Sequence, residues 1–81
     1  MDSKKACDAY LGAIRRGSRK DAMEVVAGAR EAGLSAGELY VEVFQPALRE
    51  IGRLWQENEI SVADEHLATA ITQSAMANLF D

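Results

Sequence analysis

The sequence is poor in the residues on which metal and redox sites depend. Among 81 residues there are one cysteine, one histidine and one proline, and aromatic side chains make up 6%. Cys7 has no partner for an internal disulfide, and one thiol with one imidazole cannot build a structural zinc site. A Gly-rich phosphate loop and a nucleophile elbow are missing as well. We therefore expect no metal site and no enzymatic activity within these residues.

Negative charge outweighs positive charge, with 13 Asp and Glu against 9 Lys and Arg. The formal net charge is −4, and the sequence pI is about 4.9. Binding to a phosphate backbone needs clustered Lys and Arg, so we expect no direct contact with nucleic acid. The one basic cluster, at residues 15–20, spans a predicted turn and is interpreted as a solvated loop with cations at a helix C-terminus.

Long hydrophobic runs and a signal peptide are both missing from the sequence. A membrane-spanning helix is therefore not expected, and the cytoplasm is the predicted location. Cys7 falls in register with Tyr10, Leu11 and Ile14, which is the spacing of one helix face. We interpret Cys7 as a buried structural thiol rather than a nucleophile.

The pattern that is present predicts an all-α fold. Hydrophobic residues make up 48%, and no segment alternates with period two. Ser18, Ser35 and Ser61 each precede an acid by three residues, as in a helix capping box. Gly17 and Gly33 stand where a left-handed helix C-cap is expected. The predicted helices cover residues 3–15, 18–32, 36–57 and 62–80, and their short loops favour an antiparallel four-helix bundle.

The second and the third predicted helices each have a clear predicted buried face, and the third helix is also predicted to be kinked. Pro46 lacks a backbone donor and crowds the carbonyl of Glu42, so a kink near Glu42–Pro46 is expected. The third helix is expected to bury a stripe made of Tyr40, Phe44, Ala47, Leu48, Ile51 and Trp55. In the second helix, the expected buried residues are Ala22, Val25, Val26 and Ala29.

The fourth predicted helix is almost uncharged after His66 and is rich in Ala, Thr and Ser. An uncharged surface of small residues suggests that more than one of its faces meets protein. It ends at Phe80-Asp81 without a capping glycine or a polar tail. We therefore expect residues 1–81 to form a single domain that was cut from a longer polypeptide.

The arrangement that says most about function is Trp55 followed ten residues later by Glu65-His66. The predicted turn between them would bring an indole, a carboxylate and an imidazole to one end of the bundle. Taken singly, each has a structural explanation: a core aromatic, a first-turn acid and a hydrogen-bonded histidine. Together they suit a ligand that has an aromatic face and polar edges.

The run LYVEVFQPALREIGRLWQENEISVADEHLATA resembles the helical-bundle module that precedes cobalamin-binding domains. Its Trp-x9-Glu-His motif is similar to that of the cobalamin-dependent photoreceptor regulators of the CarH type. That resemblance implies a cap over the adenosyl group of adenosylcobalamin. Trp55 would pack against the adenosyl moiety, Glu65 would hydrogen-bond the ribose hydroxyls, and His66 would help to line the pocket.

The sequence departs from this photoreceptor pattern at two points. Gln56 stands where the pattern has a histidine that captures cobalt after photolysis, and glutamine cannot form that bond in the same way. The Asp-x-His-x-x-Gly signature, which supplies the lower axial histidine, is missing. The resemblance places that signature in a Rossmann-like domain expected to follow residue 81. This chain alone is expected to bind cobalamin weakly or not at all.

Three functions are compatible with the sequence. The first is a cap in a light- or ligand-sensing transcription regulator. The second is a cap that shields a methyl-corrinoid in a methyltransferase system. The third is a protein-interaction bundle without a ligand. The sequence also leaves a homo-oligomer open.

Overall fold

The computed structural model describes residues 1–80, with the side chains of residues 1–79. The elements are α1 (Ser3–Arg15), α2 (Arg19–Glu31), α3 (Ala36–Leu39), a π-helical turn (Tyr40–Phe44), α4 (Gln45–Gln56) and α5 (Val62–Phe80). The segments from α3 to α4 follow one another without a break and form the long third helix. The all-α prediction is confirmed, and the predicted helix bounds agree to within one residue. The expected chain ending at Asp81 lies outside the described residues.

The helices begin where the serine caps predict. The Ser35 and Ser61 hydroxyls accept the N–H groups of Glu38 and Asp64, and each acid accepts the N–H of its serine in return. These are two complete capping boxes. The third is half-formed, because the Asp21 carboxylate turns to Arg16 at 3.0 Å while its N–H bonds Ser18.

The helix ends use left-handed residues. Gly17 has φ of 72° and Gly33 has φ of 102°, which confirms both predicted C-caps. The end of α4 adopts the same geometry at Asn58, with φ of 61°. Asparagine is one of the few residues besides glycine that tolerate this conformation. The sequence did not single out Asn58, because it lies among the polar residues of a loop.

Pro46 is the cause of the predicted kink. Its nitrogen has no hydrogen for the carbonyl of Glu42, so the helix cannot keep regular α-helical bonding there. The chain widens into the π turn immediately before, and the Gln45 N–H reaches back to the Tyr40 carbonyl. A π turn holds more residues than an α turn, and it therefore rotates the preceding segment relative to α4.

Because of this rotation, the buried stripe of the third helix differs from the predicted one. Phe44, Ala47 and Ile51 are buried as expected, and Leu48 is half-buried. Tyr40 is exposed, because the π turn carries Leu39 and Val43 into the core instead. Trp55 is exposed as well, and Leu54 completes the stripe one position earlier. The prediction that Tyr40 and Trp55 belong to the core stripe is wrong.

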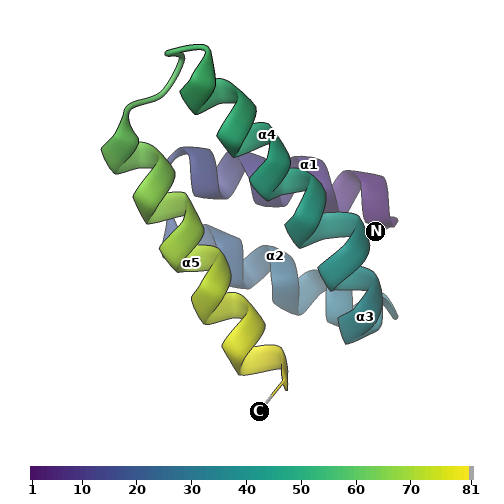
Figure 1. The fold of residues 1–81 in the computed structure, drawn as a ribbon. Coiled ribbons are helices and arrows are strands. Elements are labelled where there is room, and N and C mark those ends of the chain that lie inside the picture. Colours follow the sequence, from purple (N-terminus) through teal and green to yellow (C-terminus); the bar gives the residue numbers. More distant parts are fainter. Residues whose placement is uncertain (81) are drawn as a thin grey trace.

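The helices form two layers (Figure 1). Helices α1 and α2 run antiparallel in one layer, and α4 and α5 run in opposite directions across them. The alanine-rich core lies between the layers. In α2, Ala22, Val26 and Ala29 are buried and Val25 is half-buried. Within residues 1–80, no helix has the combination of length and apolar character that a membrane crossing requires.

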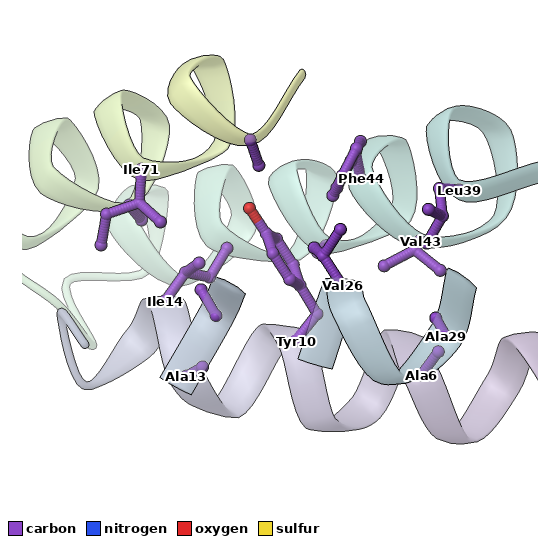
Figure 2. Close-up of a cluster of buried hydrophobic side chains, with 14 of the residues drawn as sticks. Ala6, Tyr10, Ala13, Ile14, Val26, Ala29, Leu39, Val43, Phe44 and Ile71 are labelled. Carbon is purple, nitrogen blue, oxygen red and sulfur yellow. The ribbon is translucent and has the colours of Figure 1, made fainter. Parts of the chain in front are cut away.

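Tyr10 stands at the centre of the core (Figure 2). Its ring lies 5.1 Å from that of Phe44, centroid to centroid, at an interplanar angle of 58°. The Tyr10 hydroxyl points toward α5 and donates to Thr72 Oγ1 at 2.9 Å, while the Thr72 hydroxyl donates to the Ala68 carbonyl at 3.0 Å. Both of these buried hydroxyl groups therefore have a hydrogen-bond partner. Burial raises the pKa of the Tyr10 phenol, which stays protonated.

Cys7 is half-buried, and its sulfhydryl donates to the Val43 carbonyl at 3.8 Å. Burial, and secondly the nearby Asp8 carboxylate, raise the pKa of the thiol. Because the thiolate is the reactive form, we expect the folded chain to react more slowly with Ellman's reagent than the urea-unfolded chain. Stopped-flow absorbance at neutral pH measures both rates. Equal rates would contradict a structural role for this thiol.

Candidate functional site at the α4–α5 junction

A tight reversal of the chain brings the end of α4 and the start of α5 to the same end of the molecule (Figure 1). Trp55 lies in the last turn of α4 and Glu65 in the first turn of α5. The Asn58 N–H bonds the Trp55 carbonyl at 3.0 Å, and the Glu59 N–H bonds the Leu54 carbonyl at 2.8 Å. This pair of bonds is a Schellman motif, which ends α4 and turns the chain back. The Ser61 capping box then starts α5 at once.

Arg53 holds this turn against α4. Its guanidinium bonds both carboxylate oxygens of Glu50 at 2.7 Å, bonds Glu57, and lies 3.8 Å from Glu59. These hydrogen bonds raise the pKa of Arg53 and lower the pKa of Glu50. Each exposed ion pair contributes little to stability by itself. Together they join the end of α4 to the loop that carries the chain toward α5.

Trp55 faces outward. Its exposed fraction is 45%, which is high for the largest apolar side chain in a small domain. The interpretation of Trp55 as a core aromatic that closes its helix is therefore wrong. An exposed indole offers a flat apolar surface with one N–H donor, on which a flat ring can stack.

Glu65 and His66 have different surroundings. The Glu65 side chain is 27% exposed and that of His66 is 76% exposed. The Glu65 carboxylate accepts a hydrogen bond from the Thr69 hydroxyl at 3.4 Å, and its other oxygen lies 3.1 Å from His66 Nδ1. Although the two side chains start from adjacent positions of the helix, they are in contact. The interpretation of His66 as a partly buried histidine is wrong, because its ring lies at the surface.

Helical spacing shows which residues share a helix flank with Trp55 and with Glu65. Leu48, Gly52 and Trp55 follow one another at intervals of four and three residues along one flank of α4. Glu65 begins a similar flank on α5, one that continues through Thr69 and Met76. These flanks lie on the same rotational side of the buried stripe of each helix. The two helices run in opposite directions side by side, and α5 lies on the side of α4 toward which the Trp55 flank is rotated (Figure 1). The two flanks therefore face each other across a seam, while Leu67, on the opposite flank of α5, lies against Gly17.

Apart from Trp55, the members of these flanks are all half-buried, as expected at a seam between two helices. Sequence reasoning did not assign Gly52, Thr69 or Met76 to the site. The signal that could have found them is their spacing from Trp55 and Glu65 at i−3, i+4 and i+11. Their residue types alone, a glycine, a threonine and a methionine, are unremarkable in a helix.

The seam is a surface and not an enclosed cavity. The part of the chain that the structure describes forms no pocket, and it gathers no group of three side chains suited to a metal ion. A ligand here could therefore be covered on one face only. The available groups are an indole, an accepting carboxylate and an imidazole, and they can stack on a flat ring and accept hydrogen bonds from hydroxyls.

A comparison with protein families identifies the class to which this arrangement belongs. The model of the B12 binding domain matches residues 6–79, which is nearly the whole chain. The chain therefore belongs to this family and is a helical cap domain of cobalamin-binding proteins. Domains of this kind generally pair with a cobalamin-binding Rossmann domain. No curated protein and no solved structure matches the chain.

Proposed function

We propose that this domain covers the adenosyl face of adenosylcobalamin in a light- or ligand-sensing transcription regulator and has no catalytic role of its own. The observation that carries the proposal is that the outward-facing Trp55 and the half-buried Glu65 lie at the same end of the α4–α5 seam. The resemblance of the Trp-x9-Glu-His motif to the photoreceptor regulators adds support. This surface fits an adenosyl group, because the indole can stack on the adenine ring and the carboxylate can accept hydrogen bonds from the ribose hydroxyls.

Each residue has a distinct part in this proposal. The Trp55 indole stacks on the adenine, which needs no formal charge on the ligand. The Glu65 carboxylate accepts hydrogen bonds from the ribose diol, and bonds to a charged acceptor are among the stronger ones. His66 lines the edge of the site, where its Nδ1 lies 3.1 Å from one oxygen of Glu65. The bound cofactor supplies the cobalt and the light-sensitive bond to carbon.

The domain supplies half of the site. A Rossmann-like partner domain would hold the cofactor from the other side, and the seam of the cap would close over the adenosyl group. Loss of the adenosyl group would leave Trp55 without its stacking partner. Repacking of the indole would then change the contact between the cap and its partner and pass on the signal.

Because the chain has a single tryptophan, its indole N–H gives one nuclear magnetic resonance cross-peak that reports on Trp55. We expect this peak to shift when millimolar adenosylcobalamin is added to the ¹⁵N-labelled chain in the dark. Methylcobalamin should shift it less at the same concentration, since it carries a methyl group in place of the adenosyl group. In variants that lack the indole, the backbone amide peaks of α5 are used to follow the titration.

In Trp55→Ala, the preference for the adenosyl form should disappear, and in Glu65→Gln it should weaken about tenfold, as for the loss of a charged hydrogen bond. Tyr40→Ala is the matched control, because Tyr40 is also an exposed aromatic but lies at the other end of the third helix. It should keep the preference. Equal affinities for the two cobalamins in the unchanged chain, or equal affinities for adenosylcobalamin in all variants, would contradict the proposal. A preference for methylcobalamin would instead favour the cap of a methyltransferase system.

A further inference from the structure

Gly52 lies in the middle of α4, where glycine has no structural purpose within the chain. Its φ is not positive, since the positive-φ glycines are Gly17 and Gly33. A Cβ atom built on Gly52 would meet no atom within 4 Å, so no close contact inside the domain requires its absence. Glycine inside a helix is destabilising relative to alanine. The described residues therefore contain no reason for this choice.

The position of Gly52 suggests a reason outside the chain. It precedes Trp55 by three residues and shares its flank of α4, on the side where α5 lies (Figure 1). It is half-buried, as its neighbour Leu48 is. The missing side chain leaves bare helix backbone next to the exposed indole. A flat group stacked on Trp55 could lie against this backbone only while residue 52 has no Cβ.

We propose that Gly52 is a specificity-determining position, where the nucleoside held by Trp55 is seated directly against the backbone of α4. This inference rests on the proposed function and names a further residue of the same site. A methyl group at this position would project into the volume of the ligand. The site would then discriminate against a nucleoside while the fold remained intact.

A second glycine gives a matched control. Gly28 also lies inside a helix, is half-buried, and has no atom within 4 Å of a built Cβ. It belongs to α2, in the other layer of the molecule. Gly28 therefore shows that an open helical glycine alone does not define a site. What distinguishes Gly52 is its place on the flank of Trp55.

The test compares Gly52→Ala and Gly28→Ala with the unchanged chain. Both substitutions replace a helical glycine with alanine at an open position, so both should raise the thermal midpoint, by about 4 °C. Only Gly52→Ala should weaken adenosylcobalamin binding, by about tenfold or more, as an extra methyl does in a filled site. Binding is measured from the Trp55 indole peak, and the midpoint by circular dichroism.

The outcomes separate this inference from the proposed function. If the unchanged chain prefers adenosylcobalamin and Gly52→Ala binds it equally well, the role of Gly52 is wrong and the proposed function stands. If both glycine variants lose affinity to the same degree, the role of Gly52 is also wrong. If the unchanged chain shows no preference for the adenosyl form, the proposed function fails, and this inference fails with it.

Discussion

Replacing Phe44 with alanine is expected to lower the free energy of unfolding by about 3–5 kcal/mol. The Phe44 side chain is completely buried and packs against the ring of Tyr10 at 5.1 Å. Its removal would leave a cavity where α1 meets the third helix. A domain of 81 residues has a total stability of only about 4–12 kcal/mol. The substitution would therefore remove a large part of that stability and could unfold the chain.

Urea titration followed by circular dichroism at 222 nm measures this effect. Val41→Ala is the control, because Val41 belongs to the same π turn but is 58% exposed. An exposed substitution of this kind is expected to change the free energy of unfolding by at most about 0.5 kcal/mol. Similar losses for the two variants would show that Phe44 is not a centre of the core.

Gly17→Ala is expected to lower the free energy of unfolding by about 2–3 kcal/mol, through two separate causes. The φ of 72° costs any L-residue about 1–2 kcal/mol. The added Cβ would also lie 2.6 Å from Leu67 Cδ2, which is too close for two carbon atoms. Relieving this contact has a further cost of about 1 kcal/mol, at the low end for overpacking, because the exposed Leu67 side chain can move.

Two further variants separate these causes. Gly33→Ala should show the backbone cost alone, because Gly33 has a φ of 102° and no neighbour within 4 Å of a built Cβ. In a Leu67→Ala background, Gly17→Ala should become less destabilising, because the contact is gone. If Gly17→Ala costs the same in both backgrounds, the turn between α1 and α2 does not press on α5 as described.

Much of the fold could be predicted, because its boundaries are specified by local chemistry. Ser35 and Ser61 satisfy backbone donors at the start of a helix whatever lies nearby, and Gly17 and Gly33 permit left-handed ends. Pro46 disrupts regular helix bonding through its own missing hydrogen. Local rules of this kind leave few alternatives, so the helix bounds followed directly.

The predicted burial was less accurate, because burial depends on the rotation of each helix. The sequence indicated a kink near Pro46 but not that it would take the form of a π turn, which exchanges Tyr40 for Leu39 and Val43 in the core. The hydrophobicity and helical spacing of Trp55 predict a buried side chain. The exposure of Trp55 violates that expectation, as residues that serve a ligand often do.

The candidate site was predicted in part. Its named residues, Trp55, Glu65 and His66, came from a spacing and a family resemblance, and the turn at Asn58 brings them to one end of the molecule. The adenosyl ligand and the role of each residue stay predictions. The flanks that surround them depend on how α4 faces α5. No single motif of the sequence specifies how these two helices pack.

The buried hydroxyls of Tyr10 and Thr72 have a consequence for how the domain can move. Their hydrogen bond ties the middle of α5 to α1, and breaking it inside the core would cost about 1–3 kcal/mol for the groups left unpaired. Sliding α5 along its axis, or rolling it, would break this bond. Tilting the helix about Thr72 would keep the bond intact. Of these three motions, tilting about Thr72 is therefore the one that moves the Glu65 end of α5 and leaves this hydrogen bond unbroken.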